Sequence, residues 1–166
     1  MPEKIEYRAV NILYDKPVKE LVSRIKIFPL LTIDKAARNV PVDVETLWDT
    51  GATVTCIKPA LFSRLNLYPL DATNYVTLTG IGGKITANST LVNLSFSPNF
   101  VIEYCPVYVA DFPGGAEVLI GMDIIGIGDF VVCNADNKSS FSFAVPSFPD
   151  RINLAEKAET FNKQNN

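Results

Sequence analysis

The feature that most constrains the fold is a strand-like segment that runs directly into a glycine-containing turn. Residues 42–46 alternate β-branched side chains with charged ones and lead into the apolar pair Leu47-Trp48, the pattern of a strand with one buried face. The turn begins at Asp49 and contains Gly51, which permits tight chain reversal. The sequence therefore predicts a carboxylate at a strand-to-turn junction. By alternation, Trp48 is expected to point the other way, into the core.

Most of the remaining chain repeats short β-rich segments separated by turn residues. Helix is scarce: a brief helical turn is expected at 59–62, a short helix after Gly121, and some helical character at 152–161. Phe141 and Phe143 are expected to pack in the core or against a partner. The sequence therefore predicts an all-β fold with mainly antiparallel pairing. The expected strands are residues 18–31, 42–48, 53–57, 75–79, 84–88, 90–96, 101–110, 118–121, 129–133 and 140–145.

The chain has 166 residues, a length suited to one domain. We assign residues 18–146 to this domain, 1–17 to an N-terminal extension and 147–166 to a polar C-terminal tail. The two ends could extend a dimer interface, cover a cleft or remain disordered. No internal repeat is present, so the chain does not contain two related halves.

The residue content excludes several kinds of chemistry. There is no histidine, which removes Ser-His-Asp and Cys-His catalysis and imidazole-dependent zinc sites. Cys56, Cys105 and Cys133 form no C-x-x-C pair and are expected to be buried or half-buried free thiols. We therefore expect no metal and no cofactor.

The net charge of -3 is interspersed, with no basic block that could follow a phosphate backbone. No apolar segment reaches the ~20 residues of a membrane helix, and the charged N-terminus does not resemble a secretory signal. We expect a soluble, cytoplasmic protein with no nucleic-acid or membrane partner.

Peptide hydrolysis remains open to such a chain through a pair of carboxyl groups. Two carboxyls that share one proton can activate water and protonate the leaving amine. Asp49 supplies one such group. With no internal repeat, a second copy would have to come from another subunit. Thr50 could lock the two loops together through its hydroxyl.

Two further motifs follow Asp49-Thr50-Gly51-Ala52 in order: the glycine hairpin Gly80-Ile81-Gly82-Gly83, and Leu119-Ile120-Gly121 before a short helix. With them, roughly residues 18–133 resemble the retropepsin-like aspartic proteases, as a bacterial or phage-like member. The resemblance implies a closed β-barrel or sandwich with a flap hairpin and one short helix, acting as a two-fold homodimer.

The resemblance also implies residue roles. Asp49 would be the catalytic aspartate, with Thr50, Gly51 and Ala52 supporting its loop. Residues 80–83 would form the substrate-covering flap, with Ile81 at its tip, although such a motif alone is more often an ordinary hairpin. Residues 119–121 would buttress the active-site loop.

The chain departs from the family at two places. An Arg–Asp ion pair usual in the retroviral enzymes is replaced by Met122 and Thr53. Asp123 could make a different polar contact or, as we favour, cap the following helix. Ala52 cannot donate a hydrogen bond to an ionised dyad as Ser does in some members, so we expect a pH optimum between about 4 and 6.5.

Two functions of different class fit these observations. The first is an aspartic endopeptidase acting on peptide or protein substrates as a homodimer. The alternative is a catalytically silent dimeric module that binds peptides on the same fold. A glycosidase is disfavoured because no second carboxylate pair has comparable context.

Overall fold

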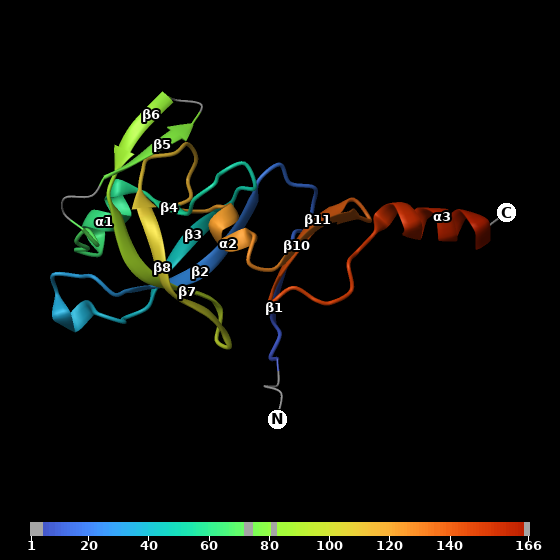
Figure 1. The fold of residues 1–166 in the computed structure, drawn as a ribbon, viewed down its shortest axis with the longest axis horizontal. Helices are drawn as coiled ribbons and strands as arrows, with labels where there is room; N and C mark the ends of the chain where they lie inside the picture. Colours follow the sequence, from blue (N-terminus) through green and yellow to red (C-terminus); the bar gives the residue numbers. More distant parts are fainter. Residues whose placement is uncertain (1–4, 72–74, 81–82, 165–166) are drawn as a thin grey trace.

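The computed structural model describes residues 5–71, 75–80 and 83–164, and its centre is a closed β-barrel (Figure 1). Six strands close the barrel in the order β2-β3-β9-β4-β8-β7. These are β2 (Leu21–Pro29), β3 (Val42–Trp48), β9 (Val118–Ile120), β4 (Cys56–Ile57), β8 (Phe100–Val109) and β7 (Ser89–Ser97).

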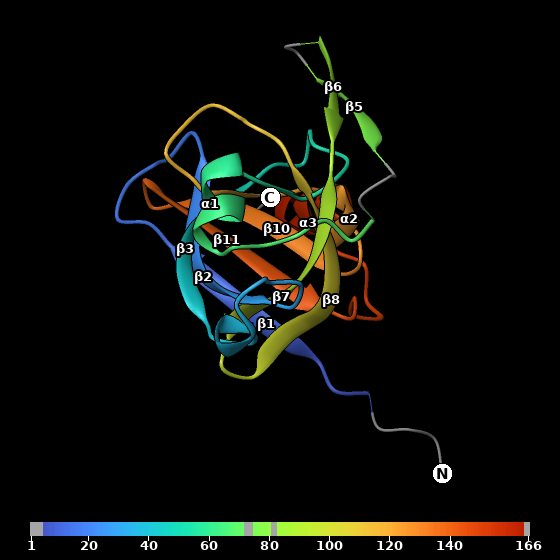
Figure 2. The same ribbon diagram turned by 90° about the vertical axis from the view of Figure 1, so that its left-hand side faces the viewer.

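Two smaller sheets accompany the barrel. A three-stranded antiparallel sheet has the order β1-β11-β10, with β1 (Arg8–Leu13), β11 (Lys138–Val145) and β10 (Asp129–Ala135). The hairpin of β5 (Val76–Gly80) and β6 (Gly83–Ala87) projects beyond the barrel, as Figure 2 shows.

The helical segments are short and peripheral. They are η1 (Lys35–Ala37), α1 (Pro59–Arg64), α2 (Met122–Ile125) and α3 (Leu154–Gln164). Pro59 begins α1, where its missing N–H costs no helical hydrogen bond. The exposed helix α3 extends away from the barrel (Figure 1). In the described parts of the chain, no helix is long and apolar enough to cross a membrane.

The predicted all-β fold is confirmed, and the expected strands agree with the observed ones to within a few residues. One strand was not predicted. β1 lies within the expected N-terminal extension, where it pairs with β11 from Arg8 opposite Val145 to Leu13 opposite Ser140. Its side chains are at most half-buried, so its sequence pattern is weak.

An aromatic cluster packs the three-stranded sheet against the barrel. Trp48 lies at its centre, with ring centroids 5.2 Å from Phe141 and from Phe143. Its indole N–H donates a 2.9 Å hydrogen bond to Ser23 Oγ. Phe96 and Phe130 complete the contacts around the indole. The predicted core positions of Trp48, Phe141 and Phe143 are therefore confirmed, and Trp48 fixes the end of β3 immediately before Asp49.

Candidate active site

Asp49 follows β3 and begins a turn supported by a strand from much later in the chain. β9 lies between β3 and β4: it pairs in parallel with β3, with Trp48 opposite Ile120, and antiparallel with β4, with Cys56 opposite Leu119. The strand before the turn and the strand after it are therefore both hydrogen-bonded to β9. Asp49 is half-buried, whereas Thr50 and Gly51 are exposed.

Backbone hydrogen bonds hold the turn at three points. The Asp49 N–H donates to Ile120 O at 3.0 Å, and the Met122 N–H donates to Ala52 O at 2.8 Å. Within the turn, the Ala52 N–H donates to Asp49 O at 3.2 Å. This arrangement places Leu119, Ile120 and Gly121 directly behind the aspartate loop.

Gly51 has a role that differs in detail from the one expected. Its φ is not in the left-handed region, so backbone freedom is not what the turn requires. Instead its N–H donates a 2.8 Å hydrogen bond to Asp49 Oδ1, and a Cβ at this position would lie 3.1 Å from the same oxygen. A side chain here would crowd the carboxylate that the backbone N–H orients.

Gly121 meets a stricter limit. A Cβ at this position would lie 2.5 Å from both C and O of Val54, and 2.9 Å from its N. Real Cβ atoms do not approach backbone atoms so closely. The chain segment after the aspartate turn therefore packs directly on the backbone of Gly121, and glycine is required by close approach.

Asp123 joins the same two segments through its side chain. Its Oδ1 accepts a 2.7 Å hydrogen bond from the Thr55 hydroxyl, and its Oδ2 accepts a 2.9 Å bond from the Thr55 N–H. The Thr55 Oγ1 in turn accepts a 3.1 Å bond from the Gly121 N–H. Hydrogen bonds to a carboxylate are stronger than neutral ones, so this network can tie the aspartate loop to α2 without an Arg–Asp ion pair.

The expectation that Asp123 caps α2 was therefore wrong. Gly121 occupies the N-cap position, with no side-chain cap bond, and Asp123 lies inside the first turn. The hydrogen bonds to Thr55, which is distant in the sequence of the same chain, take the place of a helix cap because they satisfy both carboxylate oxygens of Asp123. The importance of Thr55 was missed, and its only sequence signal is a hydroxyl between the apolar residues Val54 and Cys56.

The β5–β6 hairpin carries part of the predicted flap. Gly80 pairs with Gly83, and Gly83 has a φ of +104°, which favours glycine. Ile81 and Gly82 lie outside the described residues. Leu78, in the middle of β5, packs against the buried cluster of Cys56, Ala110 and Leu119.

A second apolar cluster, separate from the aromatic core, surrounds the loop on this side. Leu47, whose neighbour Trp48 points into the core, belongs to it together with Ala52 and Val54 of the loop. The partly buried members pack on buried Cys56, Ala110 and Leu119. An apolar, half-open surface therefore adjoins Asp49. Its other partly buried members are Leu78, Tyr108 and Phe112.

Two of the three thiols, Cys56 and Cys105, are buried, and their pKa values are raised. Burial, with the nearby Asp123 charge as a smaller cause, raises the pKa of Cys56 to about 11, and burial likewise raises the pKa of Cys105 to about 11. Both are buried as predicted, but Cys133 is exposed, contrary to expectation. It lies on the edge strand β10, where residues 131–135 are all exposed. In the described ranges, no group of three or more Cys, Asp or Glu residues could hold a metal ion.

Asp49 does not line either of two cavities found on the chain, which have volumes of about 510 and 620 Å³. Both involve strand β8 at Val101 and Glu103.

A barrel in which one strand supports a hydrogen-bonded Asp-Thr-Gly turn from behind, beside a projecting hairpin, defines the retropepsin-like class of aspartic protease folds. The model of the gag-polyprotein putative aspartyl protease family matches residues 39–126, just over half of the chain. The chain belongs to this family.

Solved structures show the same fold. A retropepsin-like aspartic protease from Rickettsia conorii superposes with a TM-score of 0.52 at 15% identity, covering 85% of this chain and 96% of that one. The EIAV protease, solved in complex with the inhibitor HBY-793, gives a TM-score of 0.50 at 23% identity, covering 69% and 92%. No functionally curated protein matches the chain.

Proposed function

We propose that the protein is an aspartic endopeptidase whose active site is completed when two chains bring their Asp49 carboxylates together on a two-fold axis. The observation that carries the proposal is the orientation of Asp49. Its carboxylate is held by the Gly51 N–H on a turn clamped by Ile120 and Met122, within a chain of an aspartyl protease family. One chain offers one such carboxylate, and a symmetric dimer offers two.

The pair would act by general acid–base catalysis. Two carboxylates a few Å apart cannot both ionise, so they share a proton. The ionised member accepts a proton from water, whose oxygen attacks the scissile carbonyl carbon. The protonated member donates to the carbonyl oxygen, and collapse of the tetrahedral intermediate transfers a proton to the departing amine. No cofactor is required by this mechanism.

The substrate would be an extended peptide lying between the hairpin of residues 76–87 and the aspartate turn, with main-chain hydrogen bonds supplying affinity. We propose that Gly80, Ile81, Gly82 and Gly83 close over it. The apolar cluster of Leu47, Ala52, Val54 and Leu78 supports a preference for apolar side chains next to the cleaved bond. Thr50 of each chain would hold the two loops together.

The test is cleavage of a peptide library between pH 4 and 7 by the wild-type protein and by Asp49→Asn, with the association state measured by sedimentation. Asp49→Asn preserves the shape of the side chain but cannot ionise, so we expect a loss of at least about 10³-fold in kcat with dimerisation retained. Activity should peak between about pH 4 and 6.5. Equal cleavage by both proteins would refute the mechanism. Tight peptide binding without cleavage by either would identify the chain as a silent peptide-binding module.

A further inference from the structure

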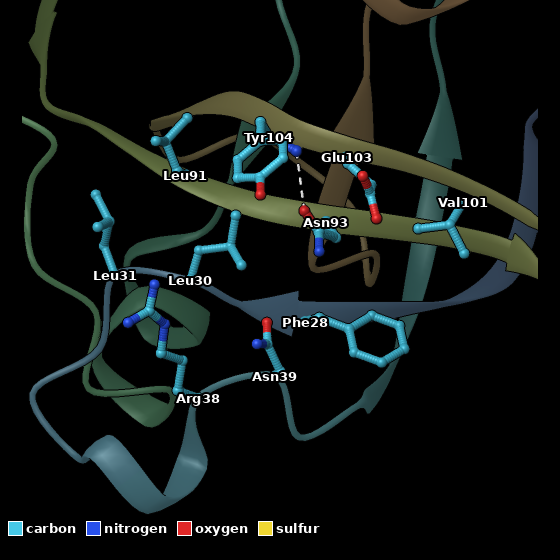
Figure 3. Close-up of a pocket in the computed structure, with 10 residues that line it drawn as sticks. All are labelled: Phe28, Leu30, Leu31, Arg38, Asn39, Leu91, Asn93, Val101, Glu103 and Tyr104. Atoms are coloured by element: carbon cyan, nitrogen blue, oxygen red, sulfur yellow. Dashed lines mark hydrogen bonds between the residues drawn. The ribbon is translucent and has the colours of Figure 1, made fainter.

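A cavity of about 510 Å³ lies at the end of the β2–β3 hairpin opposite to Asp49 (Figure 3). Leu21 of β2 pairs with Trp48, next to the aspartate turn, whereas Ile27 pairs with Val42 at the far end. The cavity begins just beyond, at Phe28. At about 3.3 Å per residue, the length of β3 separates the two places by roughly 20 Å. The cavity is therefore distinct from the aspartate site, and its volume is ordinary for a small-molecule site.

The wall of this cavity is apolar and its rim carries both signs of charge. Arg38 lies on one side and Glu103 on the other, as Figure 3 shows, and both are exposed. Neither belongs to an ion pair among the described residues. The side-chain amides of Asn39 and Asn93 add neutral polar groups. The apolar lining is Phe28, Leu30, Leu31, Leu91 and Val101.

Tyr104 is held at this cavity in an unfavourable backbone conformation. In the described chain, five residues other than glycine have positive φ; four are Asn or Asp, which tolerate it, and the fifth is Tyr104, with φ 55°. The register of β7 and β8 shifts between Val92 and Leu94, opposite this residue. The Tyr104 N–H donates a 2.9 Å bond to Asn93 Oδ1, drawn in Figure 3.

The consequence of this conformation is the placement of an aromatic ring at the mouth of the cavity. Tyr104 is 69% exposed, so packing in the core does not explain its position. In Figure 3 its hydroxyl is directed toward Leu30, between the two charged side chains. The strained backbone of Tyr104 is not offset by burial of its side chain in the core. This points to a binding role for the side chain.

We propose that this cavity binds a short apolar peptide with free ends. Its carboxylate pairs with Arg38, its ammonium group pairs with Glu103, and its side chains contact the leucines beneath the Tyr104 ring. Arg38 and Glu103, with opposite charges on either side of an apolar wall, complement a zwitterion with an apolar body. A ligand with a single charge would pair with one of these two residues and be repelled by the other. The site goes beyond the proposed hydrolysis and does not depend on it, because it shares no residue with the aspartate loop.

The probe is leucyl-leucine, titrated into the ¹⁵N-labelled 166-residue chain carrying Asp49→Asn, which cannot hydrolyse it by the proposed mechanism. We expect saturable amide shifts at Leu91, Asn93 and Tyr104, with a dissociation constant on the order of 1 mM. N-acetyl-leucyl-leucine amide lacks both charges and should bind about tenfold more weakly. Arg38→Gln and Glu103→Gln should each weaken binding roughly fivefold, whereas Lys138→Gln, an exposed charge outside the cavity, should leave it unchanged.

Tyr104→Asn tests the contribution of the ring alone, because Asn tolerates the same positive φ and the backbone conformation can be kept. We expect it to remain folded and to lose binding at least fivefold. The proposal is overturned if no saturable shift appears at this cavity, if the shifts are confined to residues 49–55, or if the blocked peptide binds as well as the free one. Unchanged binding by the Arg38 and Glu103 variants would equally overturn it.

Discussion

Replacing Gly121 with alanine is expected to destabilise the protein by disrupting the support of the aspartate turn. The new Cβ would lie 2.5 Å from the C and O atoms of Val54. Those atoms belong to the backbone, so a rotamer change cannot relieve the contact. Either the segment after the turn or the start of α2 must move, and the bond from the Gly121 N–H to Thr55 Oγ1 lengthens or breaks.

The magnitude follows from two terms. Overpacking that forces backbone shifts costs about 1–3 kcal/mol, and loss of one buried hydrogen bond costs about 1 kcal/mol. Together they give about 2–4 kcal/mol. For a domain of this size, that corresponds to a decrease in Tm of roughly 5–15 °C. Because the moved segment adjoins Asp49, peptide cleavage should fall as well.

The assay is thermal and urea unfolding of wild type, Gly121→Ala and Gly115→Ala at one protein concentration, since dimerisation would make Tm depend on concentration. Gly115 is the matched control. Its added Cβ would meet only the Glu45 carboxylate, at 3.6 Å, an ordinary contact. The reasoning is refuted if the two alanine variants differ by less than about 0.5 kcal/mol, the usual size of a surface effect.

Three further predictions concern other parts of the chain. Thr55→Val removes the hydroxyl bond to Asp123 and should lower the free energy of unfolding in urea by about 2–4 kcal/mol. Thr53→Val, at an exposed position, should lower it by less than about 0.5 kcal/mol. Similar losses for the two variants would contradict the proposed network. Because the pKa of Cys56 and of Cys105 is raised to about 11, only about one thiol in a thousand is ionised at pH 8, so brief iodoacetamide treatment should modify exposed Cys133 alone by mass spectrometry. Labelling of the two buried thiols should increase only toward about pH 10 and above; equal labelling of all three at pH 8 would be inconsistent with their burial. Tyr104→Gly should leave the free energy of unfolding unchanged or raise it by up to ~1 kcal/mol. Tyr108→Gly, at an extended position of β8, should lower it by more than ~1 kcal/mol. A clear decrease in the free energy of unfolding for Tyr104→Gly would argue against backbone strain at this residue.

Local patterns in the sequence were sufficient to predict most of the strands. Residues 42–46 alternate because one face of β3 lies in the barrel core, and this alternation, continued by the apolar pair Leu47-Trp48, predicted the bounds of the strand. The same reasoning placed Trp48 in the core and Asp49 at a turn. β1 could not be predicted in this way, because its side chains are only partly covered and its position depends on pairing with β11.

The contacts that shape the site depend on pairs of residues far apart in sequence. Thr55 and Asp123 are 68 positions apart, and neither side chain has a local pattern that identifies the other. The sequence shows a glycine at position 121 but not the Val54 backbone against which it packs. The strained conformation of Tyr104 was equally inaccessible, since it lies within an ordinary strand-like segment. Periodicity can be read from neighbouring residues. Close packing of two backbone segments, and hydrogen bonds between residues distant in the sequence, form only when the barrel closes.

The central claim, that one active site uses Asp49 from two chains, is tested most directly by mixing subunits. Wild-type and Asp49→Asn chains are combined in equal amounts, allowed to exchange fully, and assayed for peptide cleavage at constant total protein, well above the dimer dissociation constant. Random pairing leaves about one quarter of the dimers with two aspartates, so the account predicts about one quarter of the wild-type activity. Activity of about one half would mean that each chain acts with its own Asp49, and would contradict the shared site.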